Sequence, residues 1–255
     1  MEIVIIGTGN TATILGRKLK AAGHHIVQVF GRDASAASAL AYELGTESTA
    51  YWTVVNRQAD LYILAVSDIA IDEIIRELQL PDKTVVHTAA SVSKDILQRV
   101  TTHYGVLYPL QSLKKNTAYL PDIPIIIDAS DAQTLQQLTA LASSISNQVI
   151  TAGDEERLKL HLAAVFCNNF VNHLFTLMQQ YCAAEGLNFD LLKPLIRETA
   201  QRIETITPAD AQTGPAIRHD ASTIHKHLEL LENHPQLKQF YTLFTQSIQQ
   251  GTDLS

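Results

Sequence analysis

The chain has 255 residues, 46% of them hydrophobic, and a formal net charge of −7 from 19 basic and 26 acidic residues. This length suits one large domain or two of ordinary size. The mildly acidic balance argues against a general nucleic-acid binder, which needs a basic surface, although a local pocket can still take an anionic substrate.

The N-terminus and the cysteines bear on the compartment. Residues 1–7 lack the basic and apolar regions of a signal peptide, and no stretch approaches the roughly 20 apolar residues of a membrane span. Cys167 and Cys182 lie in apolar helical sequence, which indicates two buried thiols and no metal site. We expect a soluble cytoplasmic protein that binds no metal, membrane or nucleic acid.

The first 152 residues alternate short β-rich runs with helical patterns. Continuous apolar runs such as residues 3–6 are typical of parallel strands buried on both faces. Strands are expected at 3–6, 25–30, 61–66, 84–88, 104–108, 123–128 and 148–151, and helices at 11–22, 34–44, 69–78, 94–100 and 133–144. The alternation predicts a Rossmann domain over residues 1–152, with a doubly wound, mostly parallel sheet.

The pattern changes after Gly153. No convincing strand follows, and Asp154 can cap a long helix that runs to about residue 185, with acidic residues in its first turns. Further helices are expected at 189–205, 223–234 and 236–250, with a polar loop at 208–220. We therefore predict a smaller, all-helical domain over residues 153–255.

The segment after the first strand has the spacing of a dinucleotide-binding glycine loop. Gly7 permits a tight turn, Gly9 lets the pyrophosphate approach the backbone, and a small residue at the third position allows close helix–strand packing. The helix N-terminus supplies free N–H groups. The expected cofactor-binding residues are Gly7, Thr8, Gly9, Asn10, Thr11 and Ala12. A loop that holds another nucleotide, or no ligand, is the alternative.

The end of the second strand bears on the identity of the cofactor. An NAD site usually has a carboxylate about 20 residues after the glycines, but here Arg32 follows a position without one. An arginine suits the 2′-phosphate of NADP, so we expect NADP (NADPH); a solvated arginine paired with Asp33 is the alternative. Ser67 is expected to reach the cofactor, although its neighbour Asp68 could instead cap a helix.

These segments together resemble a known family. Residues 5–12 (IIGTGNTA) are similar to the pyrroline-carboxylate reductase and 6-phosphogluconate dehydrogenase-like superfamily. The closer resemblance is to bacterial Rossmann-like proteins assigned as NADP oxidoreductases, whose C-terminal helical domain has no settled function. It rests on HTAAS at 87–91 with YPLQS at 108–112, HLAAVF at 161–166 with NNF at 168–170, and QTGPA at 212–216 with Arg218 and Asp220. It implies a Rossmann domain, a helical domain that tends to pair subunits, and no particular substrate.

Candidate catalytic residues lie on the first helix of the helical domain, where members of the superfamily often place lysine or asparagine. Hydride transfer needs a proton donor or acceptor near the substrate. We expect His161 to act as acid or base, with Asn168 or Asn169 orienting a carbonyl or imine. The spacing of His161 and Asn168 places them near one helical face. Hydrogen bonding between helices is the alternative for each residue.

Polar residues elsewhere complete the expected site. Ser91 and Gln111 follow strands and are expected to meet polar groups of the substrate, whereas His87 lies inside a strand and is interpreted as a satisfied core histidine. Arg218, in the loop at 208–220, is expected to hold an anionic group. A structural ion pair is the alternative for this arginine.

Two functional hypotheses follow. The first is an NADP-dependent reductase or dehydrogenase that acts on a small polar carbonyl, imine or alcohol in a crevice between the domains, as a homodimer formed through the helices. The second is an NADP-binding redox sensor or interaction module without catalysis, because the sequence has no unmistakable catalytic dyad. Substrate-dependent oxidation of NADPH distinguishes them.

Overall fold

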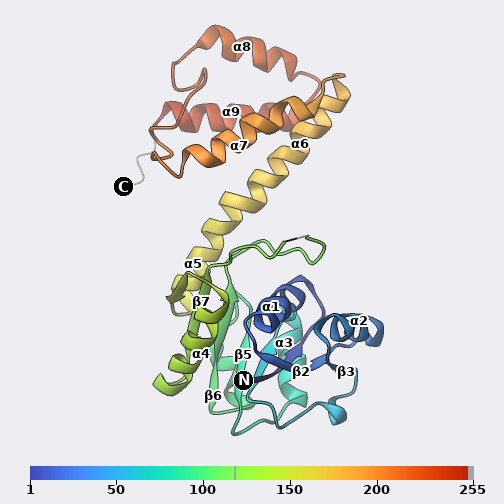
Figure 1. The fold of residues 1–255 in the computed structure, drawn as a ribbon. Coiled ribbons are helices and arrows are strands. Elements are labelled where there is room, and N and C mark those ends of the chain that lie inside the picture. The colour runs from blue at the N-terminus through green and yellow to red at the C-terminus, as the bar shows by residue number, and fades with distance from the viewer. Residues whose placement is uncertain (118, 252–255) are drawn as a thin grey trace. The chain divides into compact units, whose positions relative to one another are not determined.

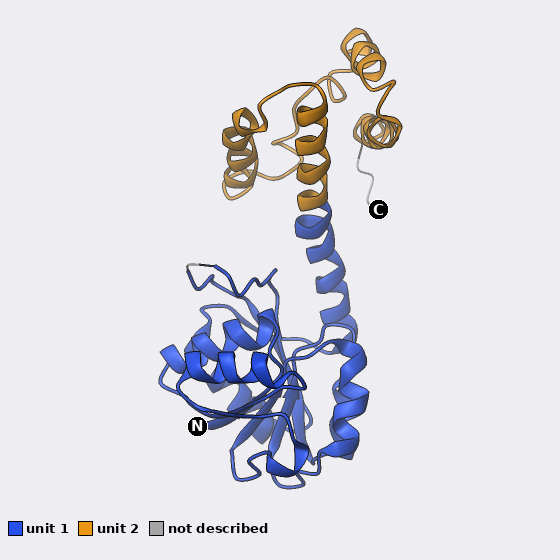
Figure 2. Cartoon of the chain, turned by 90° about the vertical axis from the view of Figure 1, so that its right-hand side faces the viewer, with its two compact units in different colours: residues 1–170 blue, residues 171–255 orange. Residues whose placement is uncertain are grey.

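The computed structural model describes residues 1–117 and 119–251 (Figure 1). The chain divides into two compact units, unit 1 (residues 1–170) and unit 2 (residues 171–255) (Figure 2). The last four residues of the predicted helical domain lie outside the described part. The expected boundary at residue 152 falls between the last strand of the sheet and the helix that begins at Asp154.

Unit 1 is built around an eight-stranded sheet with the order β3-β2-β1-β4-β5-β6-β7-β8. The first six strands in chain order are parallel to one another, in the doubly wound order of a dinucleotide-binding fold. Strand β7 is antiparallel to β6, and β8 is parallel to β7. The strands are β1 (Glu2–Ile6), β2 (His25–Phe30), β3 (Glu47–Thr49), β4 (Leu61–Leu64), β5 (Thr84–His87), β6 (His103–Pro109), β7 (Ile125–Ala129) and β8 (Val149–Thr151). The predicted Rossmann architecture is confirmed.

Helices cover both faces of this sheet (Figure 1). Ile3 and Ile5 of β1 pack in one buried cluster, and Val4 and Ile6 pack in another on the opposite face. The first cluster takes residues from α1, α2 and α4, and the second from α3. These helices are α1 (Asn10–Ala21), α2 (Ala34–Leu44), α3 (Asp68–Glu77) and α4 (Ala132–Ile145). Burial on both faces explains the continuous apolar runs of the central strands.

Two local features differ from the sequence-based expectations. Strand β3 was not anticipated, because it is only three residues long, polar, and paired on one side with β2. The long helix expected from Asp154 is α5 (Asp154–Ala164), a π-helical turn (Val165–Phe170) and α6 (Val171–Ala184). Cys182 is buried as expected, but Cys167 is exposed because it lies in that π-helical turn, where no residue is buried.

The described part of unit 2 consists of α6, a short 3-10 helix (Phe189–Leu192) and three further α-helices, which confirms the all-helical prediction. They are α7 (Lys193–Arg202), α8 (Ala221–Leu230) and α9 (Pro235–Gln249). Leu177, Cys182 and Ala216 are the buried apolar residues of its described part. No helix among the described residues is long and apolar enough to cross a membrane.

Candidate functional site

The glycine loop joins the end of β1 to the start of α1. The backbone of Gly7 has a φ of 129°, and a Cβ there would lie 2.1 Å from the carbonyl oxygen of Ala65 on the neighbouring strand connection. Only glycine fits this position. Gly16 allows α1 to approach both α2 and the sheet, since a Cβ there would lie 2.8 Å from a methyl carbon of Leu44 and 3.1 Å from one of Ile5. Ala12 is fully buried, as its packing role requires.

Gly9 leaves the N-terminus of α1 open. A Cβ at Gly9 would meet nothing within 4 Å, so the backbone faces free space. Gly9 caps α1 without a side-chain hydrogen bond, and the first turn contains no acidic residue. Main-chain N–H groups of this turn are therefore available to an anion, with the positive end of the helix dipole behind them.

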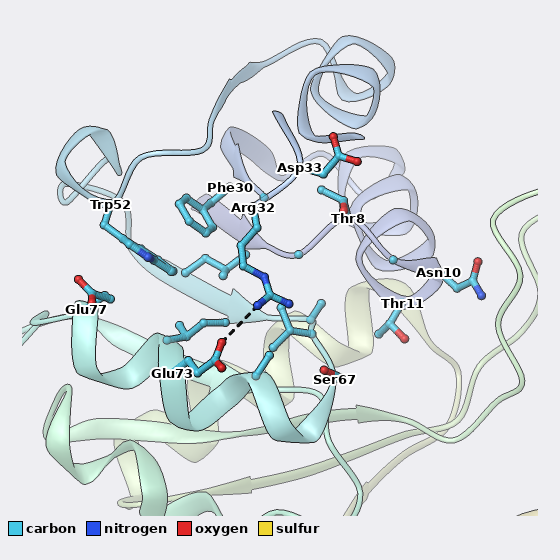
Figure 3. A pocket seen from close by; sticks show the side chains of 18 residues that line it. Thr8, Asn10, Thr11, Phe30, Arg32, Asp33, Trp52, Ser67, Glu73 and Glu77 are labelled. Carbon is cyan, nitrogen blue, oxygen red and sulfur yellow. Dashed lines mark hydrogen bonds and ion pairs between the residues drawn. The ribbon is translucent and has the colours of Figure 1, made fainter. Parts of the chain in front are cut away.

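A cavity of about 720 Å³ lies at the carboxyl ends of β1, β2 and β4 (Figure 3). The strand order reverses between β1 and β4, which is where doubly wound sheets bind dinucleotides. The glycine loop, the end of β2 and α3 supply its walls. Of the predicted cofactor residues, those lining it are Gly7, Thr8, Gly9, Asn10, Thr11, Arg32 and Ser67.

Arg32 follows β2 at the rim of this cavity. Its side chain is 77% exposed, and its guanidinium pairs with the Glu73 carboxylate of α3 at 3.2 Å (Figure 3). The alternative pairing with Asp33 is wrong, because that carboxylate caps α2 through the N–H groups of Ser35 and Ala36. Arg32 thus lies at the cavity, and its exposed ion pair with Glu73 is weak enough to be replaced by a ligand.

An aromatic wall closes the same end of the cavity. The rings of Phe30 and Trp52 stack with centroids 3.7 Å apart and planes 23° from parallel. Both side chains line the cavity (Figure 3). Trp52 lies in a short 3-10 helix after β3, and nothing in its local sequence indicates a ligand-facing position. The pair offers a flat apolar surface beside Arg32.

Polar contacts extend from the cavity along the ends of β4 and β5. Ser67 lines the cavity and precedes α3, but its side chain makes no capping hydrogen bond. Asp68, the first residue of α3, accepts a hydrogen bond from the hydroxyl of Ser91, which follows β5. Asp68 is not the helix cap that was considered, because Ser67 occupies the N-cap position. The Ser91–Asp68 contact joins the start of α3 to the loop after β5 at the carboxyl edge of the sheet.

A buried arginine ties α5 to the loop after β5. Arg157 is fully buried, and its guanidinium donates to the carbonyls of residues 90 (3.1 Å) and 92 (2.6 Å) and to Asp154 (2.8 Å). His87 is also fully buried, and burial lowers its pKa to about 4, with the positive charge of Arg157 acting in the same direction. Nδ1 of His87 accepts from the N–H of Ala89, whereas its Nε2 and Nη1 of Arg157 have no hydrogen-bond partner among the described residues. His87 is a core residue as predicted, but only one of its two ring nitrogens forms a hydrogen bond.

His161 lies one helical turn beyond Arg157. Its Nδ1 is 2.9 Å from the hydroxyl of Tyr108, which comes from the carboxyl end of β6. Burial raises the pKa of the Tyr108 hydroxyl, while Arg157 lowers it and Asp68 raises it. Tyr108 is therefore neutral at physiological pH and can donate to or accept from the imidazole. The sequence analysis did not name Tyr108 as a site residue, although Tyr108 ends the predicted strand at 104–108 and begins the segment at 108–112 that carries the family resemblance.

The remaining predicted residues occupy different settings. Asn168 and Asn169 are exposed in the π-helical turn, whose wider spacing shifts the α-helical register that related Asn168 to His161. Gln111 is engaged in its own loop, with Nε2 at 3.5 Å from the carbonyl of Asp122. Arg218 is exposed in unit 2, in the loop before α8.

Comparison with known proteins identifies the family. Residues 2–91 match a family described as NADP oxidoreductase, coenzyme F420-dependent, and residues 123–248 match a domain of unknown function. A protein from Bacteroides fragilis that is assigned as an NADP oxidoreductase is 38% identical over 98% of both chains, with a TM-score of 0.91. The chain belongs to this family of NADP oxidoreductases. It is an NADP-dependent enzyme of the reductase and dehydrogenase type.

More distant structures share the fold. Pyrroline-5-carboxylate reductase from Streptococcus pyogenes is 15% identical over 98% of this chain and 99% of its own, with a TM-score of 0.68. Imine reductase from Myxococcus stipitatus, solved with NADP⁺, is 16% identical over 98% and 95%, with a TM-score of 0.66. No curated protein matches the sequence.

The cavity fits the cofactor of the family. The space in front of Gly9 and the free N–H groups of α1 suit the pyrophosphate, and Arg32 suits a 2′-phosphate. Phe30 and Trp52 supply the apolar surface that a purine needs.

Proposed function

We propose that this enzyme transfers a hydride between NADP(H) and a small polar molecule with a carbonyl, imine or alcohol group, and that His161 moves the accompanying proton. The hydrogen bond between His161 and Tyr108, at the carboxyl edge of the sheet, carries this proposal. Bound NADPH supplies the hydride. The chain supplies a proton donor for the oxygen or nitrogen that is reduced.

Contacts within unit 1 connect this pair to the cofactor cavity. Ser67 lines the cavity, and the adjacent Asp68 accepts from Ser91 in the loop after β5. The same loop accepts hydrogen bonds from Arg157, one turn before His161 on α5. Polar groups thus follow the carboxyl ends of β4, β5 and β6 from the cavity to the pair.

Tyr108 allows His161 to act as an acid when the substrate is reduced and as a base when it is oxidised. The tyrosine hydroxyl is nearly buried and can donate to Nδ1 of the neutral imidazole or accept from the imidazolium. It therefore fixes the orientation of the ring and leaves Nε2 for the substrate. In reduction the imidazolium gives its Nε2 proton to the substrate, and in oxidation the neutral ring takes it back.

The other predicted residues have proposed roles around this pair. We propose that Asn168 or Asn169 orients the carbonyl or imine, that Ser91 and Gln111 meet polar groups of the substrate, and that Arg218 holds an anionic group. The two asparagines, Ser91 and Gln111 belong to unit 1 and are exposed, as a substrate contact requires.

The test is oxidation of NADPH with a panel of small carbonyl and imine compounds. We expect His161→Gln to lower kcat at least about 100-fold while the Kd of NADPH stays unchanged. Tyr108→Phe keeps the ring but removes the hydroxyl, so we expect a smaller loss of kcat and a shifted pH profile. His173→Gln, an exposed histidine on α6, is the matched control. Full activity in His161→Gln contradicts the assignment, and a wild-type enzyme inert across the panel favours a sensor or binding role.

We also propose that residues 153–255 serve as the substrate and dimerisation domain, and that two copies pair through unit 2 in the cytoplasm. The described part of unit 2 buries only three apolar residues, too few for an independent core. It also has a groove of about 450 Å³ between α6, α8 and α9. Its apolar lining includes Leu174, Met178, Leu230, Leu237, Phe240 and Phe244. A second copy of the same helices would cover such a surface.

Light scattering coupled to size exclusion tests the dimer. We expect a dimeric wild type and a monomeric Leu230→Glu variant, because Leu230 lines the groove and is 65% exposed. Leu191→Glu is the control, since Leu191 is 76% exposed but lies outside the groove lining. A monomeric wild type, or equal effects of the two variants, contradicts the proposal. Circular dichroism verifies that both variants retain their helices.

A further inference from the structure

The loop between β6 and β7 is attached to the first helix. The main-chain N–H of Lys115 donates to the Asn10 side-chain oxygen at 3.0 Å, and its carbonyl accepts from the Arg17 guanidinium at 2.7 Å. Asn10 and Arg17 are two turns apart on α1, so the peptide at Lys115 lies along this helix. Leu113 packs against the buried cluster beneath, which holds the segment from its other side.

The direction of the chain brings Lys114 towards the phosphate-binding end of α1. The N–H of Lys115 contacts the first residue of the helix, and its carbonyl contacts a residue two turns further on. The residue before Lys115 therefore lies on the N-terminal side of this attachment. Asn10 is at the edge of the cofactor cavity, at the opposite end from Trp52 (Figure 3).

The charged side chains that line the cavity carry a net negative charge. Its lining contains one basic side chain against three acidic ones, namely Arg32 against Asp33, Glu73 and Glu77. NADP brings a pyrophosphate as well as a 2′-phosphate that alone carries about −1.5 to −2 charges. The lining therefore needs cations from outside it, and at the pyrophosphate end it offers only helix N–H groups.

Two lysines at this end are available. The side chains of Lys114 and Lys115 are exposed, and neither forms an ion pair with any residue of the described ranges. Arg17, which holds the backbone of this segment, is by contrast paired with the carboxylate of Glu43. An unpaired lysine on a segment whose backbone is attached to the first residue of a phosphate-binding helix is suited to a phosphate.

We propose that the lysine segment (residues 112–115) is a second arm of the cofactor site, in which Lys114 and Lys115 neutralise the pyrophosphate of NADP. Asn10 and Arg17 act as positioning residues, because they hold the backbone of Lys115 against α1. Asn10 thus contributes to the site through this loop and not by a direct phosphate contact. The inference rests on NADP binding and is independent of the proposed substrate chemistry.

Ligand affinity tests the proposal without turnover. Trp52 is the only tryptophan of the chain and lines the cavity, so its fluorescence reports binding. The probes are NADPH, NADH and ADP-ribose, which contain a pyrophosphate, and adenosine 2′-monophosphate, which does not. For Lys114→Ala/Lys115→Ala we expect the Kd of the first three to rise by a common factor of about ten, and that of the fourth to stay within about twofold.

Matched variants separate this effect from other causes. Lys83→Ala/Lys226→Ala removes the same charge away from the cavity and is expected to leave every Kd within about twofold. Arg32→Ala is expected to weaken NADPH and adenosine 2′-monophosphate and to spare NADH and ADP-ribose. An equal loss in the control double variant, or a loss for adenosine 2′-monophosphate that matches the loss for NADPH, overturns the proposal.

A double-mutant cycle tests the anchoring role of Asn10. Asn10→Ala alone is expected to weaken pyrophosphate ligands, because the loop loses one of its attachments. If Asn10 acts through the lysine segment, this substitution adds little to Lys114→Ala/Lys115→Ala. Fully additive losses would mean direct contact with the phosphate and would overturn the positioning role.

Discussion

The ion pair between Arg32 and Glu73 competes with NADP for the same guanidinium. We predict that Glu73→Gln increases the affinity for NADPH, because the 2′-phosphate no longer has to displace a carboxylate. The substitution keeps the size of the side chain and removes only its charge. NADH has no 2′-phosphate, so its affinity is expected to stay within about twofold.

The expected gain in NADPH affinity follows from the exposure of the Arg32–Glu73 ion pair. The two side chains are 77% and 66% exposed and separated by 3.2 Å. Ion pairs of this kind contribute about 0.2–1 kcal/mol, which sets a gain in NADPH affinity of about fivefold at most. The gain is expected to shrink as salt is added, because exposed charges are screened over about 10 Å at 0.1 M.

Calorimetric titration of NADPH and NADH against wild type, Glu73→Gln and Glu77→Gln measures this effect. Glu77 also lines the cavity but forms no ion pair with Arg32, so its variant controls for the loss of one negative charge. The competition model requires a larger gain in Glu73→Gln than in Glu77→Gln. Equal gains in the two variants refute the competition, and a loss of NADPH affinity in Glu73→Gln would mean that the carboxylate orients Arg32 for the cofactor.

Three further predictions concern stability. Gly7→Ala is expected to lower the free energy of unfolding by about 3 kcal/mol or more, since its Cβ would meet a carbonyl at 2.1 Å. Gly9→Ala should leave Tm unchanged and weaken the binding of NADPH. Equal Tm shifts in the two variants would contradict this contrast. Arg157→Met should cost about 3 kcal/mol in urea unfolding, because a buried carbonyl (residue 90) and a part-buried one (residue 92) lose their donor, and an unchanged midpoint would contradict it. Asp131 caps α4 through hydrogen bonds that lower its pKa, so its stabilisation is present above the unfolded pKa and lost as pH falls through the native one. Asp131→Ala should therefore cost about 1 kcal/mol near pH 6, and the Tm difference should shrink towards about pH 2.

Local pattern was enough to predict the fold of unit 1. The burial of alternate β1 residues on opposite faces produces continuous apolar runs, and glycines between strand and helix mark the phosphate loop. These signals are contained within about ten neighbouring residues. Strand β3 gave no such signal, because a three-residue polar strand at an edge is held by pairing with β2 alone.

The contacts of the candidate site were less accessible to sequence reasoning. Tyr108 and His161 are 53 residues apart and meet only because β6 and α5 pack together. Arg157 was not named as a site residue, because a charged residue in the first turns of a helix is usually exposed, yet it is fully buried. Periodicity assigns a residue to one face of its own element, but the partner of that face depends on tertiary packing. The π-helical turn also changes the phase of the helix, which α-helical spacing does not anticipate.

The glycine loop and the selectivity of the cofactor site have different physical origins. Gly7 is required by backbone geometry, whereas Gly9 leaves the open space through which a dinucleotide can reach the start of α1. The charges that act on the phosphates come from other segments, since Arg32 is balanced by Glu73 of α3 and the lysine segment reaches α1 from beyond β6. A change in α3 or in the β6–β7 loop can therefore alter cofactor preference while the glycine loop stays intact. Substitutions in these two segments should change affinity without changing Tm, whereas substitutions at Gly7 should change both.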